Sequence, residues 1–459
     1  EIGVTFIGPN AHAIISMGDK ITSKKIAIDA GVSCVPGHMG LIESADEAIK
    51  ISHKIGYPVM IKASAGGGGK GMRIAWTDEE AREGYQSSKN EAANSFGDDR
   101  IFIEKFIEQP RHIEIQVLGD KHGNIIYLGE RECSIQRRNQ KVIEEAPSSF
   151  LDEKTRNAMG KESVALAKKV NYDSAGTVEF IVDKDKNFYF LEMNTRLQVE
   201  HPVTELITGV DLVEQMIKSA NGDILSISQE SVKLNGWALE SRIYAEDPYR
   251  NFLPSIGRIK RYRPPSEGIW KDHVIRNDTG VFEGGEISMY YDPMIAKLCT
   301  WGENRDIAIN TMKDALDVFE LDGIGHNIPF LQAVYDHDRF KSGNITTAFI
   351  SEEYPDGFSG AEVNNQHTRR IAAICALMHD ITEHRAADIS GALPNHERHV
   401  PDLWSVEIGG AHYAADINGE EGLRNISIKD PDGGLDTLDM EVLTSWKPGQ
   451  QLVKAFIDN

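Results

Sequence analysis

The chain has 459 residues, a formal net charge of −22 and hydrophobic residues at 40% of its positions. This length is enough for about three domains, and the acidic charge argues against binding to nucleic acid or to an anionic membrane, because phosphate contacts need clustered cations. The four cysteines form no Cys-x-x-Cys pair, so neither a zinc site nor a disulfide framework is indicated. The most apolar short run, 371–378, is far below the roughly 20 residues that a membrane span needs.

The chain begins with a strand-like stretch, 4–9, and we therefore expect further residues, including any targeting segment, to precede it. Helices are predicted over 18–31 and 44–56. The second helix has Ser44 and Glu47 as a capping box.

A glycine-rich loop follows, in Ile-Lys-Ala-Ser-Ala-Gly-Gly-Gly-Gly-Lys-Gly-Met-Arg-Ile-Ala, residues 61–75. Its glycines formally satisfy G-x-G-x-x-G, but the dinucleotide fingerprint requires a following helix and Met72–Trp76 reads as a strand. A Walker-A loop fails because Gly71 follows Lys70 where Ser or Thr is needed. A glycine hairpin between two strands is suited to folding main-chain N–H groups over phosphate oxygens.

Residues 112–136 predict a hairpin with its turn near Asp120–Asn124. Polar His112, Glu114 and Gln116 alternate with apolar residues, so one face is predicted to join the core and the other to be available for a ligand.

A second hairpin carries the densest chemistry of the chain. Strands are predicted over 177–183 and from 188 onward, with a polar turn at 184–187. Folding about Asp185/Lys186 places Glu179 opposite Glu192, and directly opposed like charges destabilise a sheet pair. A divalent cation would remove this conflict. Asn194 shares the face of Glu192, and so does Arg196 if the strand continues. The hard oxygen ligands of Glu179, Glu192 and Asn194 suit Mg²⁺ or Mn²⁺.

Further helices are predicted near 152–170, 211–220, 304–319 and 327–337, with strands around 233–246. Beyond about 360 the pattern changes to a helix over 365–381 and short strands with glycine turns. The fold class is therefore α/β (α+β).

Several motifs occur together and in order. They are Met-Gly-Asp-Lys (17–20), the glycine loop, Glu-Lys-Phe-Ile (104–107), Pro-Arg-His-Ile-Glu-Ile-Gln (110–116), Cys-Ser-Ile-Gln-Arg-Arg (133–138), Gln-Lys-Val-Ile-Glu-Glu-Ala-Pro (140–147) and Glu-Met-Asn-Thr-Arg-Leu-Gln-Val-Glu-His-Pro-Val-Thr-Glu (192–205). Over residues 1 to about 350 the chain resembles the biotin carboxylase component of biotin-dependent carboxylases, in the ATP-grasp superfamily. The stretch 353–358 and the tail after it are most similar to α subunits of propionyl-CoA carboxylases.

The resemblance implies a domain order. Residues 1–17 would be the remnant of an N-terminal Rossmann-like subdomain, 18–230 the ATP-grasp domain with a lid at about 58–107, and 231–352 the biotin carboxylase C-terminal domain. Residues 360–459 would be a helix plus a β-rich domain that docks the subunits together.

The resemblance also implies roles for individual positions. Phosphates of ATP would be bound by two lysines and the closing loop, and adenine by a strand edge, chiefly through main-chain groups. At Asn139 some carboxylases have His, so its nucleotide contact can differ. The implied ATP-binding set is Lys20, Lys62, Gly66, Gly67, Gly68, Gly69, Glu104, Lys105, Ile107, His112, Gln136 and Asn139. The metal would be held by Glu179, Glu192 and Asn194, and bicarbonate by Lys141, Arg196, Gln198 and the backbone N–H of Val199.

In the implied reaction, Glu200 deprotonates bicarbonate as it attacks the γ-phosphate of ATP, and Arg242 stabilises the biotin enolate. The catalytic set is therefore Glu200, Arg196, Lys141 and Arg242. Cations must offset the repulsion between bicarbonate and the triphosphate, so the site is expected to be locally basic in an acidic chain.

The implied cofactors are ATP, Mg²⁺ or Mn²⁺, and biotin carried on a domain that this sequence does not contain, since no Ala/Val-Met-Lys-Met occurs. The implied partners are the biotin carboxyl carrier domain and a carboxyltransferase β subunit, in a hetero-oligomer of the bacterial cytoplasm or, in a eukaryote, the mitochondrial matrix. Three other functions are possible. The chain could be the α subunit of a methylcrotonyl-CoA or acetyl-CoA carboxylase, or a non-catalytic assembly module. It could also be another ATP-grasp ligase, but such a ligase would share the glycine loop and the metal hairpin and would lack the 196–205 pattern.

Overall fold

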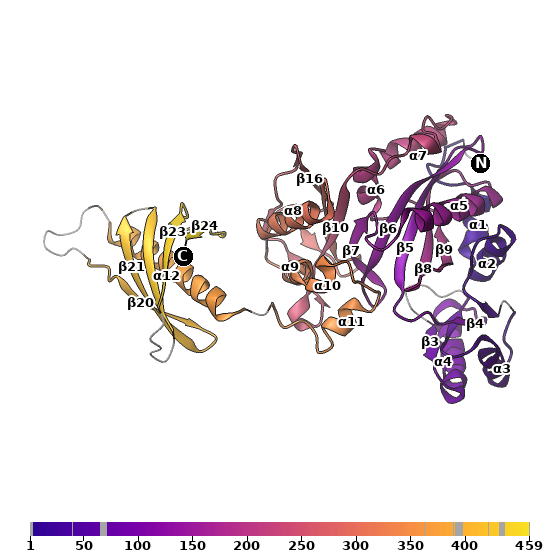
Figure 1. The fold of residues 1–459 in the computed structure, drawn as a ribbon, viewed down its shortest axis with the longest axis horizontal. Helices are drawn as coiled ribbons and strands as arrows, with labels where there is room; N and C mark the ends of the chain where they lie inside the picture. Colours follow the sequence, from indigo (N-terminus) through magenta and orange to yellow (C-terminus); the bar gives the residue numbers. More distant parts are fainter. Residues whose placement is uncertain are drawn as a thin grey trace. The chain divides into compact units, whose positions relative to one another are not determined.

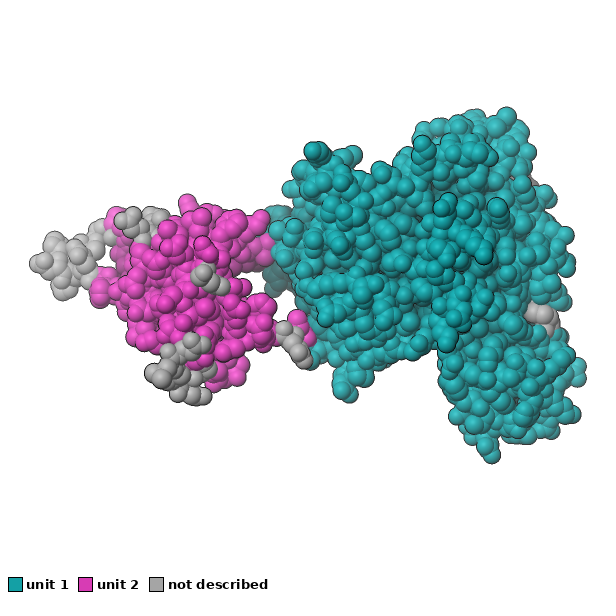
Figure 2. Space-filling view, in the orientation of Figure 1, with its two compact units in different colours: residues 1–359 teal, residues 360–459 magenta. Residues whose placement is uncertain are grey.

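The computed structural model describes residues 3–38, 40–64, 71–361, 363–388, 390, 398–420, 422–430 and 437–458. The chain divides into two compact units, residues 1–359 and 360–459, which Figure 1 draws as a ribbon and Figure 2 colours separately. The units are described one at a time below.

The first unit is built on an antiparallel sheet with the strand order β15-β16-β18-β10-β7-β6-β5-β8-β9. Its central strands alternate apolar residues, which enter the core, with the polar residues of the site. In chain order the strands are β5 Arg111–Gly119, β6 Ile125–Arg137, β7 Gln140–Ala146, β8 Ser174–Val182, β9 Phe188–Asn194, β10 Trp237–Tyr244, β15 Gly268–Ile269, β16 His273–Thr279 and β18 Met294–Gly302.

The two predicted hairpins are confirmed. In β5, Ile113 and Ile115 are fully buried in the core beside α5 (Glu153–Lys169), and the alternate residues lie on the other face. In the β8–β9 hairpin the register pairs Glu179 with Glu192.

One condition that was left open is not met, and one local expectation is wrong. The strand does not continue to Arg196, because β9 ends at Asn194 and the chain turns into α6 (His201–Thr208), where Pro202 fits the first turn. Residues 4–9 form no strand, and they lead instead into α1 (Ala11–Gly18), capped by the Asn10 side chain.

A smaller sheet, of order β1-β4-β2-β3, packs against two helices (Figure 1). Only part of it falls within 58–107, the range expected for the lid, and that assignment stays a prediction. The apolar core of this sheet includes Ile61 and Ile103, which are fully buried. Gly66–Gly69 lie outside the described residues. The elements are β1 Gly37–His38, β2 Val59–Ala63, β3 Met72–Ala75, β4 Ile101–Lys105, α3 Ala45–Ile55 and α4 Asp78–Phe96.

The rest of the first unit surrounds the large sheet. An apolar core, formed between β10, β18 and the helices packed on them, contains Leu239, Leu298 and Phe330, all fully buried. The remaining helices are α2 Lys20–Asp29, α7 Leu212–Asn221, α8 Arg305–Asp317, α9 Ile328–Asp336, α10 Asp338–Lys341 and α11 Phe349–Glu353, with 3₁₀ turns η1 Gln229–Ser231 and η2 Pro248–Arg250. The short strands are β11 Glu246–Asp247, β12 Leu253–Pro254, β13 Gly257–Arg258, β14 Arg261–Arg263, β17 Glu286–Ile287 and β19 Glu320–Asp322.

The second unit packs one long helix on a meander of five antiparallel strands. The helix extends beyond its predicted end at 381, and its buried stripe of Ala372, Ala376 and Leu377 packs against Ile426 and Ile428 of the sheet. The elements are α12 Asn365–Ala387, β20 Leu403–Ile408, β21 Ala411–Glu420, β22 Leu423–Lys429, β23 Thr437–Thr444 and β24 Ala455–Asp458.

Candidate active site

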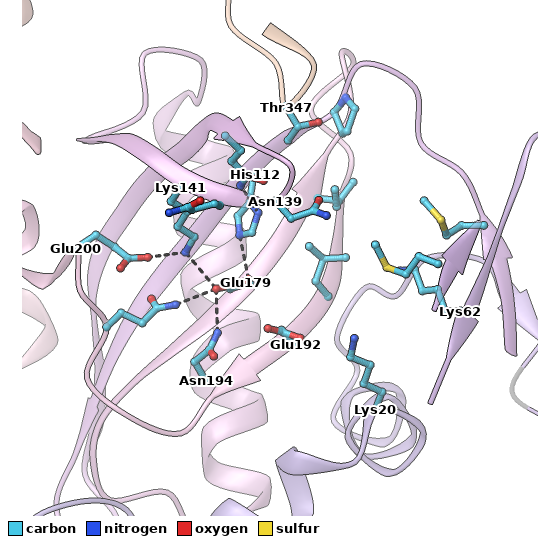
Figure 3. A pocket seen from close by; sticks show the side chains of 18 of the residues that line it. Lys20, Lys62, His112, Asn139, Lys141, Glu179, Glu192, Asn194, Glu200 and Thr347 are labelled. Carbon is cyan, nitrogen blue, oxygen red and sulfur yellow. Dashed lines mark hydrogen bonds and ion pairs between the residues drawn. The ribbon is translucent and has the colours of Figure 1, made fainter. Parts of the chain in front are cut away.

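A cavity of about 750 Å³ in the first unit is lined by residues of the large sheet, the small sheet and α2. Nearly all of the predicted site residues that the structure describes line it (Figure 3). They are Lys20, Lys62, Glu104, His112, Gln136, Asn139, Lys141, Glu179, Glu192, Asn194, Arg196, Gln198, Val199, Glu200 and Arg242. Two do not line it: Lys105 donates from Nζ to the carbonyls of Gly56 and Tyr57, and Ile107 follows the end of β4.

The sheet register places three carboxylates side by side. Glu114 of β5 pairs with Glu179 of β8, which pairs with Glu192 of β9. Such a row is stable only if cations lie against it. At its other end Glu114 pairs with Arg131 of β6, and Lys141 of β7 reaches Glu114 at 2.6 Å and Glu179 at 3.2 Å.

Glu192 is different, because it makes no hydrogen bond or ion pair with any described residue. In Figure 3 its carboxylate points into the cavity toward Lys20 of α2. Burial lowers the pKa of Lys20, an effect that Glu192 partly offsets. Asn194 donates to Glu179 Oε1 at 2.9 Å, and its amide oxygen accepts from Arg196 at 3.1 Å. Carboxylate and amide oxygens are the ligands that a hard divalent cation prefers, so the metal site at Glu179, Glu192 and Asn194 stays a prediction of the right ligand type.

Lys141 joins the metal end of the site to the predicted base. Its Nζ lies 2.5 Å from Glu200 Oε1, and the three carboxylates around it raise its pKa well above the ordinary value despite the opposing effect of burial. Burial would raise the pKa of Glu179, but Lys141 and His112 hold it well below its usual range.

Arg242 holds the second oxygen of Glu200. Its Nη2 lies 3.0 Å from Glu200 Oε2, and its Nε donates to Glu144 Oε1 at 2.6 Å. Glu200 is 2% exposed, and a cation holds each of its two carboxylate oxygens at the wall of the cavity.

Arg131 was not identified from the sequence, where it is one charge in Gly-Glu-Arg-Glu-Cys. Its side chain is fully buried, and it donates to Glu114 Oε1 at 2.5 Å and to Gln198 Oε1 at 2.7 Å. It also donates to Gln116, Thr177 and, at 2.9 Å, to Thr204 of α6. The pairing of β5 with β6 could have indicated it, since Arg131 lies opposite Glu114.

The residues predicted to bind bicarbonate line the same cavity as Glu200. Because Arg131 accepts no bond, it fixes the Gln198 amide so that its nitrogen donates to Glu179 Oε1 at 2.8 Å. Arg196 lies past the end of β9 and donates only to Asn194 and to the Leu197 carbonyl, so it has no carboxylate partner among the described residues. Lys297 of β18 donates to the Val199 carbonyl at 3.0 Å, which fixes the loop between β9 and α6.

The predicted nucleotide residues form two groups. Lys62 Nζ lies 2.7 Å from the buried Glu104 carboxylate, which also pairs with Lys24 of α2. His112 Nε2 lies 3.0 Å from Glu179 Oε2, and although burial alone would lower the pKa of His112, this carboxylate raises it. Gln136 contacts His112 Nδ1 at 2.9 Å.

Three family profiles match the chain in succession. They are described as "Carbamoyl-phosphate synthase L chain, ATP binding domain" over residues 19–228, "Biotin carboxylase C-terminal domain" over 240–352 and "Propionyl-coenzyme A carboxylase BT domain" over 371–459. The second and third separate this chain from the other ATP-grasp ligases considered above.

Solved structures give the same picture for the first unit. The biotin carboxylase domain of Hydrogenobacter thermophilus 2-oxoglutarate carboxylase, in complex with MgADP, ADP and bicarbonate, is 49% identical with a TM-score of 0.74 and covers 78% of each chain. The Campylobacter jejuni biotin carboxylase complex is 45% identical with a TM-score of 0.73, over 76% of this chain and 77% of that one.

Curated relatives cover more of the chain. It is 65% identical to the propionyl-CoA carboxylase α chain of Ruegeria pomeroyi over 99% of this chain and 68% of the relative. The mitochondrial α chain of Homo sapiens is 59% identical over 82% of this chain, which spans about half (51%) of the human protein. The chain therefore belongs to the propionyl-CoA carboxylase α-chain family and carries its ATP-grasp biotin carboxylase fold.

Proposed function

We propose that this chain carboxylates biotin with bicarbonate at the expense of ATP, as part of an acyl-CoA carboxylase. The observation that carries the proposal is Glu200, buried at the cavity wall between Lys141 and Arg242 and on the same cavity as the Glu179–Glu192 pair. The two cations hold both carboxylate oxygens in place on the cavity that the residues predicted to bind bicarbonate also line, and a general base must be held within reach of the proton that it takes.

Glu179 and Glu192 would hold Mg²⁺ or Mn²⁺, with Asn194 beside them. The ion would neutralise charge on the phosphates of ATP. Lys20 and Lys62 project toward the same space from α2 and β2, so they are placed to bind phosphate oxygens. The adenine edge at 104–107 and the closing loop at Gly66–Gly69 remain predictions.

Bicarbonate would bind between Arg196, Gln198 and the backbone N–H of Val199, with Lys141 supplying a point charge. Glu200 takes its proton as an oxygen of bicarbonate attacks the γ-phosphorus, and the bond from that phosphorus to ADP breaks. The products are carboxyphosphate and ADP. Carboxyphosphate then gives CO₂ and phosphate, and phosphate accepts the ureido proton of biotin.

Arg242 would bind the ureido oxygen of biotin, where a fixed cation stabilises developing negative charge. Because the same guanidinium already contacts Glu200, the position of biotin is tied to the position of the base.

The test is ADP release by the full-length protein that contains this chain. We expect release to require both bicarbonate and biotin, and to fall when Glu200 is changed to Gln. Glu214→Gln, on the exposed surface of α7, is the control. Release that is independent of biotin would favour another ATP-grasp ligase, and no release at all would favour a non-catalytic assembly role.

The proposals for the acyl acceptor and the partner subunit are supported by the second unit and by the curated relatives. We propose propionyl-CoA as the final acceptor, supported by the match of 371–459 to the BT domain and by the relative at 65% identity. The unit would dock the chain to a carboxyltransferase β subunit, in the cytoplasm of a bacterium or the mitochondrial matrix of a eukaryote. No helix in the described part of the chain has the length and hydrophobicity of a membrane span.

Carboxylation assays of the holoenzyme with acetyl-, propionyl- and methylcrotonyl-CoA test the acceptor. Deleting 360–459 from the full-length protein tests docking. We expect loss of complex formation with free-biotin carboxylation retained, whereas loss of both activities would contradict this division of labour.

A further inference from the structure

A second row of polar side chains crosses the large sheet, and one member of the row contacts Arg242. Glu240 of β10 pairs directly with Glu144 of β7 on one side and with Cys299 of β18 on the other. All three side chains are fully buried. Two carboxylates opposed in this way repel each other, and burial adds a desolvation cost to each charge.

The hydrogen bonds of this row leave two atoms unpaired. Glu144 Oε1 accepts from Arg242, and Glu240 Oε2 accepts from the Cys299 thiol at 3.4 Å. The other two oxygens, Glu144 Oε2 and Glu240 Oε1, are buried and have no partner among the described residues. Buried polar atoms are almost always hydrogen-bonded, and one proton placed between these two oxygens satisfies both.

We infer that Glu144 and Glu240 share one proton, carried by Glu240, and that this carboxyl pair positions the Arg242 guanidinium against Glu200. The protonated Glu240 Oε1 donates to Glu144 Oε2, which leaves Glu144 Oε1 as the anchor of Arg242. Glu144 and Glu240 are thus positioning residues, which act on the reaction only through Arg242. This role rests on the proposed biotin carboxylation.

The electrostatics agree with this arrangement. Burial and the neighbouring Glu144 raise the pKa of Glu240 well above its usual value. Burial also raises the pKa of Glu144, to about 7, although Arg242 opposes the shift. The other titratable and charged groups that act on the pair are Lys141, Glu200, Tyr244, Lys297 and Tyr335.

The proton itself can be observed by infrared difference spectroscopy of the full-length protein. At about pH 8 an ordinary glutamate is ionised. We expect the spectrum of the wild type minus that of Glu240→Gln to contain a protonated-carboxyl carbonyl band that shifts in D₂O. Absence of this band would overturn the inference, whether or not the protein carboxylates biotin.

Kinetics test the positioning. Glu240→Gln keeps an N–H donor for Glu144 Oε2, so we expect kcat with biotin within about threefold of the wild type. Glu240→Leu removes the donor, and we expect kcat to fall about tenfold or more, as is usual when the outer partner of a functional side chain is lost. Without the donor the pKa of Glu144 rises further, so the acidic limb of the pH profile should move to higher pH, with the KM for ATP unchanged.

The matched control is Glu145→Gln. Glu145 is the next residue of β7, is equally buried and pairs with Arg305 on the other face of the sheet. The Glu145→Gln substitution should leave the acidic limb of the pH profile of kcat unchanged. Equal damage by Glu240→Gln and Glu240→Leu would contradict the inference, as would an unshifted acidic limb in Glu240→Leu. If the wild type releases no biotin-dependent ADP, the proposed function fails while the infrared band still tests the shared proton.

Discussion

Arg131→Met is expected to destabilise the first unit strongly. The guanidinium is fully buried and donates to five side chains, so its removal leaves their acceptors unsatisfied and leaves Glu114 with Lys141 as its remaining cation. An opposite charge about 4 Å away at an effective dielectric constant of about 20 contributes about 4 kcal/mol. Breaking a buried ion pair at one partner costs a similar amount, about 3–5 kcal/mol.

Urea unfolding followed by a signal from the first unit measures this loss. With an m-value of about 1–3 kcal/mol/M, the midpoint should fall by at least about 1 M. Arg82→Met is the control, because Arg82 pairs with Asp46 on the surface and is 55% exposed. That substitution should change stability by less than about 1 kcal/mol.

Arg131→Met should also raise the bicarbonate KM of the folded fraction, because Gln198 loses the contact that orients its amide. An Arg131→Met protein whose free energy of unfolding lies within about 1 kcal/mol of the wild type would refute the reasoning. It would mean that the buried row is held together by packing rather than by charge.

The remaining predictions concern the reaction and pH. Glu200→Gln should lower kcat by about 10²–10⁴ with a modest change in bicarbonate KM, and near-normal turnover at saturating bicarbonate would exclude Glu200 as the base. Arg196→Lys keeps the charge but loses the bidentate fork, so bicarbonate KM should rise more than kcat falls in steady-state assays. Glu179→Gln and Glu192→Gln should each weaken Mg²⁺-ATP binding in a titration with nucleotide, and unchanged affinity in both would contradict the metal site. Burial would raise the pKa of Glu114, but Arg131 and Lys141 lower it to about 2. The stability that this provides is present above the ordinary value near 4.5 and is lost as pH falls toward about 2, so acid unfolding of Glu114→Gln should show a smaller pH dependence over this range.

Local pattern was enough to predict the hairpins and most helices. Alternation placed His112 and Glu114 on one strand face, and the polar turn at 184–187 set the Glu179–Glu192 register, which the structure confirms. Each of these depends on residues close in the chain. The strand predicted at 4–9 failed because apolar composition alone does not supply a pairing partner.

Pairings between distant strands could not be predicted. The sequence does not show that β10 lies beside β7, so it does not bring Glu240 to Glu144, which is separated from it by 96 residues in the numbering (240 − 144). Arg131 was missed for the same reason, because its five partners come from four different parts of the chain. The residues predicted to bind substrate were recognised by motif, whereas the contacts that hold them in place depend on sheet topology.

The charge of the cavity explains how an acidic chain can admit two anionic substrates. The whole chain has 49 Lys and Arg against 71 Asp and Glu, whereas the cavity lining has six against five. Four of these six cations, Lys24, Lys62, Lys141 and Arg242, are already paired with carboxylates, so an anion that binds one of them must replace a protein partner. Lys20 and Arg196 also line the cavity, and they have no carboxylate within hydrogen-bonding distance among the described residues. Each is therefore a cation that an incoming anion can bind without first breaking an ion pair.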